Sequence, residues 1–206
     1  MSRIRIAWLT LVLGTAGIAA GCTTTSESGE AVAKAPTVAT LDVCHGYDCH
    51  FRTKVTMTAR DARTLSGYFR NANTPAAERA AIARAVQLFE NKATKTIGVA
   101  DRPLSAFLGA KEKGQMDCLD ETANTLTLLR YLAGRGLLKH HTVGGDVSRG
   151  FLLDARYFHS AASITEKSGR RWAVDSWFGK AGAAPQIMPL EEWRSRGNLS
   201  ELWEEG

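Results

Sequence analysis

The chain has 206 residues, of which 44% are hydrophobic and 23% are charged, and these proportions are those of a globular protein. They exclude a chain that is disordered throughout. The 26 Lys and Arg outnumber the 21 Asp and Glu, but the resulting charge of +5 is not concentrated in one run and indicates no nucleic-acid partner. The four cysteines are too few for a disulfide-based scaffold, so the role of each depends on its position.

The first 21 residues are typical of an export signal. Arg3 and Arg5 precede an uncharged, mostly apolar run over 6–20, which is too short to span a bilayer comfortably. The small residues Ala-Ala-Gly then stand directly before Cys22, and this arrangement resembles a bacterial lipobox. We expect Cys22 to be lipidated and to begin the mature chain. The alternative is an ordinary secretory signal that ends beside a cysteine.

Residues 22–40 are predicted to be a flexible, lipid-anchored tether. The stretch from Thr23 to Val38 is rich in Thr, Ser, Ala and Gly and lacks hydrophobic periodicity. Acyl chains on one residue would hold the protein at a membrane surface without a spanning helix. By resemblance to lipoprotein sorting signals, Thr23 after the lipidated cysteine favours the outer membrane, facing the periplasm. A single domain is then expected over 41–206.

The second and third cysteines lie close together, in Cys44-His45-Gly46-Tyr47-Asp48-Cys49-His50. Thiolates and imidazoles are preferred zinc ligands, but adjacent Cys-His dipeptides cannot easily aim all four groups at one ion. An exported location also favours oxidation. We therefore favour a Cys44–Cys49 disulfide over a metal site, with His45 and His50 in a surface loop. In the chain-entropy model this short loop contributes about 2 kcal/mol at most.

Two elements are predicted between this loop and the fourth cysteine. Residues 54–58 alternate polar and apolar side chains and are rich in Thr and Val, which predicts a strand. Asn73-Thr74-Pro75 then provides a helix cap followed by proline in the first turn. Apolar residues at helical spacing predict an amphipathic helix over 75–91 whose role is core packing.

The fourth cysteine, Cys118, lies at the start of a predicted helix. Leucines recur at three-residue steps after it, and Gly134-Arg135-Gly136 indicates a C-terminal stop, so we expect a helix over about 117–133. A thiol in the first turn meets unpaired backbone N–H groups and the positive end of the helix dipole, which favour the reactive thiolate. A lone cysteine is more often a small buried residue. An unpaired thiol in an exported protein nevertheless asks for a specific explanation.

The downstream sequence predicts an antiparallel hairpin that carries a base and an orienting carboxylate. One strand begins at His159 and runs to Thr165, and the second covers 171–178. One possible loop is Lys167-Ser168-Gly169, with Gly169 in the left-handed region. Glu166 then pairs with Arg170, and each step back along the first strand is matched by one step forward along the second. Asp175 then lies opposite Ala161 and diagonal to His159 on the same face.

A two-residue Ser168-Gly169 loop would instead place Asp175 opposite Ala162, on the other face of the sheet. In either register an aspartate inside a strand needs a reason, because strands disfavour it and burial of an unpaired carboxylate is costly. One reading is that Asp175 caps the strand or pairs with an arginine locally. The other is that it orients His159, which in turn deprotonates Cys118.

The order Cys118, His159, Asp175, with the cysteine at a helix start and the other two on consecutive strands, resembles the transglutaminase-like branch of the papain-like fold. The similarity is to bacterial transglutaminase-like cysteine proteinases, through Cys118-Leu119-Asp120, His159-Ser160-Ala161 and Val174-Asp175. Residues 44–193 also resemble uncharacterised proteobacterial lipoproteins with MDC-x-DE-x-x-N and WAVDSWF segments. The resemblance implies an α+β fold in which the nucleophile helix packs on an antiparallel sheet.

The resemblance also implies acyl-transfer chemistry on amide bonds, as a cysteine peptidase, amidase or transamidase. Cys118 would be the nucleophile, His159 the general acid and base, and Asp175 the orienting group. Gln115 lies too close to Cys118 to match the glutamine of papain-like proteases, so the backbone N–H of Cys118 would have to stabilise the oxyanion. The alternative is a noncatalytic envelope lipoprotein that binds peptides or another envelope protein through the same cleft.

The remaining candidates have simpler explanations. Asp120, Glu121 and Asn124 follow Cys118, and acidic residues there stabilise a helix start. His140 or His141 could be the base, and Cys118 and His141 could form a metal site, but we favour a place at the surface or at a strand edge for both histidines. Trp172, Trp177 and Trp193 are expected in the core or along a cleft. The last nine residues, 198–206, are expected to be a solvated tail. The sequence contains no nucleotide-binding or metalloprotease motif, so we expect no cofactor and no metal. The expected partners are the membrane, through the lipid, and a peptide or protein in the envelope.

Overall fold

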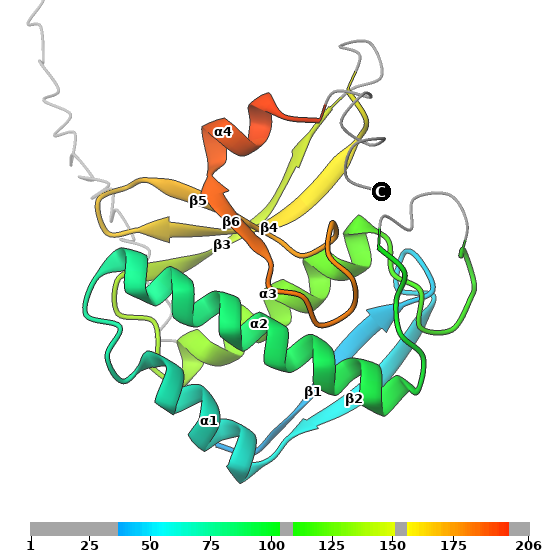
Figure 1. Ribbon diagram of the computed structural model, residues 1–206, viewed down its shortest axis with the longest axis horizontal. Coiled ribbons are helices and arrows are strands. Elements are labelled where there is room, and N and C mark those ends of the chain that lie inside the picture. The colour runs from blue at the N-terminus through cyan, green and yellow to red at the C-terminus, as the bar shows by residue number, and fades with distance from the viewer. Residues whose placement is uncertain (1–36, 104–108, 151–155, 198–206) are drawn as a thin grey trace, which may run out of the picture. The chain divides into compact units, whose positions relative to one another are not determined.

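The computed structural model describes residues 37–103, 109–150 and 156–197 (Figure 1). The predicted export signal, Cys22, nearly all of the predicted tether and the predicted C-terminal tail lie outside these residues. The first strand begins at Ala39, two residues before the expected start of the domain. None of the described helices combines the length and apolar composition that crossing a bilayer requires.

The strands form two antiparallel sheets. The smaller sheet is a hairpin of β1 (Ala39–His45) and β2 (Phe51–Met57). The larger sheet has four strands in the order β3-β4-β5-β6. Its strands are β3 (His141–Arg149), β4 (His159–Glu166), β5 (Arg171–Asp175) and β6 (Gln186–Pro189). Each neighbouring pair of strands is antiparallel and consecutive in the chain.

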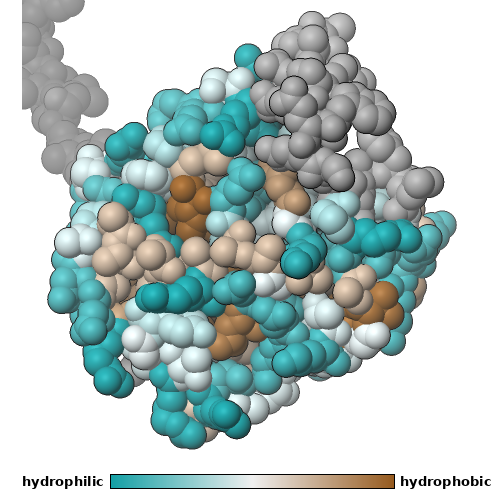
Figure 2. Space-filling view, in the orientation of Figure 1, coloured by the Kyte–Doolittle hydropathy of each residue, from teal (hydrophilic) through white to brown (hydrophobic). Residues whose placement is uncertain are grey.

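Four helices accompany these sheets in the described part of the chain: α1 (Ala59–Phe69), α2 (Pro75–Ile97), α3 (Cys118–Gly134) and α4 (Leu190–Ser195). Helices and antiparallel sheets occupy separate stretches of sequence, so the predicted α+β class is confirmed at this level. Hydrophilic side chains dominate the face that carries α1 and α2, and apolar side chains gather there in small patches (Figure 2).

Helix α3 connects the two sheets, because it packs against β1 on one side and against β3 and β4 on another (Figure 1). The leucine side chains of its second half, Leu128, Leu129 and Leu132, are fully buried in the main core. Asp117 caps the helix by accepting hydrogen bonds from the backbone N–H groups of the next turn. The predicted helix was therefore correct to within one residue at each end, and its N-terminus is held firmly in place.

Helix α2 begins where its sequence predicts but extends further. Thr74 accepts a hydrogen bond from the backbone N–H of Ala77, at 3.1 Å, and Pro75 is the first helical residue. The helix ends at Ile97 rather than at the predicted residue 91, because Gly98 provides the left-handed cap with φ of 83°. Its buried face recurs at helical spacing and includes Ile82, with Val86 and Phe89.

The β4–β5 hairpin adopts the register expected from a three-residue loop. Ala162 pairs with Val174 and Ile164 with Trp172, and the backbone N–H of Glu166 donates to the carbonyl of Arg170 at 2.8 Å. Gly169 has φ of 90°, as the left-handed position in the loop requires. The predicted register is therefore confirmed, although β5 ends at Asp175 and not at the predicted residue 178.

Candidate functional site

The three predicted site residues lie at the ends of three elements. Cys118 begins α3, His159 begins β4 and Asp175 ends β5. The hairpin register brings His159 and Asp175 together, with 2.7 Å between Nε2 and Oδ2. Both side chains are buried, so this hydrogen bond is shielded from water. The reading in which Asp175 contacts His159 is thus the one that the described contacts favour.

The other ring nitrogen of His159 has a free lone pair. An ionised carboxylate accepts hydrogen bonds and donates none, so Asp175 fixes the proton of the neutral imidazole on Nε2. Among the described residues, Nδ1 of His159 has no hydrogen-bond partner although it is buried. Aromatic rings surround the imidazole, with centroid distances of 4.8 Å to Trp177, 5.2 Å to Phe178 and 5.7 Å to Trp193. The ring is therefore held in place with Nδ1 available as a base.

The Cys118 thiol is free and half-buried at the start of α3. Burial raises the pKa of Cys118 to about 11, and the carboxylates of Asp117 and Asp175 also raise it. The backbone N–H groups of Ser160 and of Cys118 itself act in the opposite direction. The expectation that a helix start would favour the thiolate is therefore wrong here, because desolvation and nearby acids outweigh the helix N-terminus. Ser160 follows His159 directly, so the sulfur lies beside the first residues of β4.

Asp175 is held by more than His159. Its Oδ2 also accepts from Trp193 Nε1 at 2.7 Å, and its Oδ1 accepts from the backbone N–H of Trp177 at 3.3 Å. The sequence predicts both tryptophans only in the core or along a cleft. Trp193 and Trp177 are indeed buried, at 1% and 5% exposure. The Trp193–Asp175 bond joins residues 18 apart across two elements, and the local sequence pattern contains no trace of it.

The acidic residues after Cys118 have a different role from the one expected. Asp120 accepts hydrogen bonds from the backbone N–H groups of Tyr47 at 2.8 Å and Cys49 at 2.6 Å. Asn124 accepts from the Cys44 backbone N–H and donates to its carbonyl. These side chains fasten the 44–49 loop to the first turns of α3, next to Cys118. Stabilisation of the helix end alone does not account for them.

The predicted disulfide is confirmed, since Cys44 and Cys49 are joined by a bond of 2.04 Å. Within the described ranges, Cys44, Cys49 and Asp120 alone have the mutual spacing of a metal site, and disulfide sulfurs are not thiolate ligands. His50 is exposed as expected. His45 is not in a surface loop: it ends β1, is 2% exposed and hydrogen-bonds Thr53.

A group of three buried or half-buried carboxyls, those of Glu121, Asp101 and Glu90, lies near the site. Glu121, in the first turn of α3, accepts a hydrogen bond from Ser176 at 3.0 Å, and Ser176 directly follows Asp175. Burial raises the pKa of Glu121 to about 8 and that of Asp101 to about 7. Burial and the charge of Glu121 also raise the pKa of Glu90, on α2, well above its usual range. These carboxyls repel one another and favour at least partial protonation near neutral pH.

Gln115 does not contribute an oxyanion donor. Its side chain is buried, its Oε1 accepts from the backbone N–H of Arg102 at 3.3 Å and its Nε2 donates to the carbonyl of Ala100 at 3.2 Å. The amide therefore joins the segment that precedes α3 to residues 100–102. The backbone N–H of Cys118 remains the candidate oxyanion donor, as the sequence suggested.

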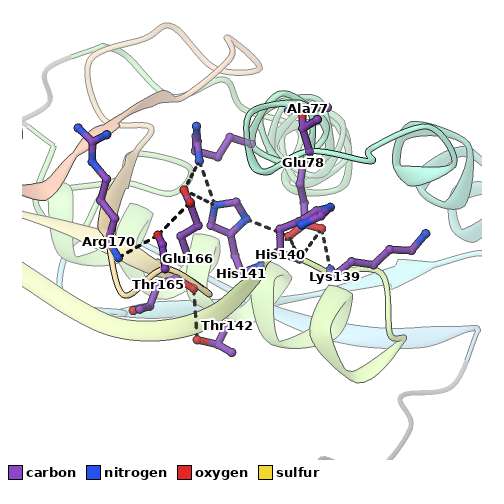
Figure 3. Close-up of polar contacts among 12 residues, drawn as sticks. Ala77, Glu78, Lys139, His140, His141, Thr142, Thr165, Glu166 and Arg170 are labelled. Carbon is purple, nitrogen blue, oxygen red and sulfur yellow. Dashed lines mark hydrogen bonds and ion pairs between the residues drawn. The ribbon is translucent and has the colours of Figure 1, made fainter.

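The histidine pair 140–141 belongs to a separate cluster (Figure 3). His141 opens β3, an edge strand of the larger sheet, but its side chain is fully buried and not at the surface. Its Nδ1 lies 2.9 Å from Glu78 Oε1, and its Nε2 lies 3.2 Å from Arg79 Nη1. His141 therefore fastens β3 to the start of α2, in contacts separate from those of His159.

A pocket of about 290 Å³ opens beside the site. It is lined by Asp175, Phe178, Gly179, Ala184 and Gln186. Phe178 contributes one wall and its ring also contacts His159. The pocket is thus adjacent to the imidazole and has both aromatic and amide groups on its walls.

Comparisons with protein-family models, curated proteins and solved structures found no match to this chain. The function proposed below therefore depends on the geometry and chemistry of these residues.

Proposed function

We propose that this protein is an envelope lipoprotein that carries out acyl transfer on amide or peptide bonds through Cys118, His159 and Asp175. The observation that carries the proposal is the buried 2.7 Å contact between His159 and Asp175, which leaves the Nδ1 of the imidazole unpartnered. A histidine oriented in this way can serve as the base for a thiol nucleophile. The Cys118 sulfur lies by the backbone N–H of Ser160, the residue after His159, and forms no hydrogen bond to Nδ1. The placement of Cys118 at the start of a helix that packs on β4 supports a papain- or transglutaminase-like fold.

The chemistry begins from a neutral thiol, since the pKa of Cys118 is about 11. The His159 Nδ1 takes the thiol proton as the sulfur attacks the carbonyl carbon, and the backbone N–H of Cys118 donates to the oxyanion. His159 then gives the proton to the amine as the C–N bond breaks and a thioester forms. Release of the acyl group to water is hydrolysis, and release to a second amine is transamidation. Asp175 stabilises the imidazolium at each stage.

The first prediction concerns the reactivity of the thiol. Iodoacetamide should alkylate Cys118 at neutral pH, and His159→Ala should slow this reaction by about tenfold or more, because the base that removes the proton is lost. Alkylation is measured by mass spectrometry of the folded protein, in which Cys44 and Cys49 are oxidised. His50→Ala is the matched control, since His50 is exposed, and should leave the rate unchanged.

The raised pKa of Cys118 is also the observation that favours the alternative, a noncatalytic lipoprotein that binds peptides or another envelope protein through the same cleft. A thiol that stays inert to alkylation in the folded wild type would exclude the enzyme and leave this alternative. An equal rate in wild type and His159→Ala would show that the imidazole is not the base.

The lipid anchor is proposed on the sequence alone. Attachment through Cys22 would hold the domain at the outer membrane, facing the periplasm, where peptide or protein substrates of the envelope are accessible. Expression with radiolabelled palmitate should label the wild type and not Cys22→Ser. Labelling that persists in Cys22→Ser would contradict the anchor without affecting the proposed chemistry.

A further inference from the structure

We infer that Trp193 is a positioning residue, whose indole N–H holds the Asp175 carboxylate in the orientation that binds His159. This inference rests on the proposed function for its catalytic meaning, but the contact itself is independent of it. A single oxygen, Oδ2 of Asp175, accepts both the indole N–H and the imidazole N–H, each at 2.7 Å. Among the described residues, the second oxygen accepts a longer bond, of 3.3 Å, from the backbone N–H of Trp177.

Two donors on one oxygen restrict rotation of the carboxylate. The His159 bond alone would still allow Asp175 to turn about its χ2 angle and present either oxygen. The Trp193 donor comes from α4 and binds Oδ2, which restricts this rotation. Hydrogen bonds to a buried charged group are stronger than neutral ones, and a buried carboxylate that loses a donor is poorly satisfied.

Trp193 is itself held by Arg149. This arginine ends β3, is 5% exposed and pairs in register with His159 across the sheet. Its Nη1 donates to the carbonyl of Trp193, and its guanidinium lies 4.5 Å from the centroid of the Trp193 ring. No carboxylate in the described part of the chain forms an ion pair with Arg149. The buried guanidinium instead interacts with the carbonyl and the ring of Trp193.

A second tryptophan provides an unusually close comparison. Trp177 packs nearer to the imidazole than Trp193 does, at 4.8 Å against 5.7 Å between ring centroids. Its Nε1 is buried and has no hydrogen-bond partner among the described residues. Both residues contribute a large ring to His159, but only the Trp193 side chain donates to Asp175, whereas Trp177 donates through its backbone N–H, which a substitution retains. Replacement of each by phenylalanine therefore separates loss of the donor from loss of ring packing.

The test follows the imidazole Nε2 proton by NMR in Cys118→Ala protein, so that the readout does not depend on thiol chemistry. In the parent this buried proton, bonded to a carboxylate, should give a downfield, slowly exchanging resonance. Trp193→Phe should increase its exchange rate by about tenfold or more, because the carboxylate is free to turn. Trp177→Phe should change the exchange rate by less than about twofold. His159→Gln identifies the resonance by removing the ring that carries the proton.

An exchange rate in Trp193→Phe equal to that of the parent, or an equal increase in Trp177→Phe, would overturn the inference. The cooperative unfolding transition of each variant is recorded first. If Trp193→Phe does not fold, the two indole protons of the parent are compared instead: that of Trp193, which donates to Asp175, should exchange more slowly than that of Trp177, and equal rates would overturn the inference. Failure of the proposed function is seen separately, as a Cys118 thiol that is inert in the wild type. In that case the resonance still reports whether Trp193 orients Asp175.

Discussion

Glu78 is a buried carboxylate whose two oxygens accept hydrogen bonds from three successive backbone N–H groups and one imidazole. The N–H groups belong to Lys139, His140 and His141, at 2.6 to 3.0 Å, and the Nδ1 of His141 lies at 2.9 Å (Figure 3). The chain entering β3 is therefore attached to the first turn of α2 through one side chain. A buried anion with this many donors is well satisfied, and loss of the anion leaves the donors without partners.

Glu78→Gln should lower the free energy of unfolding by about 3 kcal/mol, because an amide group would place N–H donors against the backbone N–H groups. Urea denaturation followed by circular dichroism measures the change. Glu192→Gln is the control, since its ion pair with Arg196 is about half exposed, and the expected loss is within about 0.5 kcal/mol. Equal losses in the two variants would show that burial at Glu78 confers no special stability.

At the scale of elements, the 44–49 loop is a left-handed turn attached to α3. Gly46, Tyr47, Asp48 and Cys49 all have positive φ, between 50° and 87°, and three of these residues carry side chains that disfavour it. Asp120 binds two N–H groups of the turn, and Asn124 holds Cys44 on both its N–H and its carbonyl. The turn thus persists through the combination of the disulfide and α3.

The double variant Cys44→Ser, Cys49→Ser should lower the free energy of unfolding by about 2 kcal/mol, as expected for a short closed loop. Because Asn124 still holds the end of β1, the folded protein should keep its hairpin of β1 and β2. Thermal unfolding measures the loss, and amide exchange at Val43 and Thr53, which face each other in that hairpin, measures whether the strands remain paired. Loss of protection at these amides would show that the disulfide alone maintains the hairpin.

The elements differ in how much the sequence reveals of them. The β4–β5 register was predictable because a Gly at the left-handed loop position fixes which residues oppose each other, and that register places Asp175 near His159. Strand β3 was not predicted, and Gly144 and Gly145 lie in its middle, where glycine is disfavoured. In the structure they lie at a register shift, where a side chain at Gly144 would collide with Ser163.

The contact between His159 and Asp175 was predictable from this register, whereas the grouping of Cys118 with them remains a prediction. The protonation of the thiol depends on burial that no local pattern records. The Trp193–Asp175 bond and the attachment of the 44–49 loop by Asp120 likewise depend on contacts between distant segments. Helix α1 was missed although Thr58 and Asp61 form a capping box at its start.

At the scale of the whole molecule, buried acids make stability depend on pH. The pKa of Asp101 is about 7 and that of Glu121 about 8, whereas both groups ionise near pH 4 in an unfolded chain. Between these limits the unfolded chain has released protons that the folded protein retains. The free energy of unfolding therefore falls as pH rises through this window and is greatest at its acidic end. The pKa values of Asp61 and Glu166 are lowered, so these two groups change stability only at pH values below this window.

Thermal unfolding from pH 5 to pH 8.5 should show a fall in the free energy of unfolding on the order of 5 kcal/mol. Glu121→Gln should reduce this fall, because an amide keeps the hydrogen bond to Ser176 and removes the charge that burial and neighbouring carboxylates disfavour. Glu191→Gln, an exposed change on α4, should leave the slope unaltered. A stability that is constant or rises across this range in the wild type would mean that the carboxyls near the site ionise freely. The first turn of α3 would then carry its acidic charge at neutral pH, and the thiol of Cys118 would be harder still to ionise.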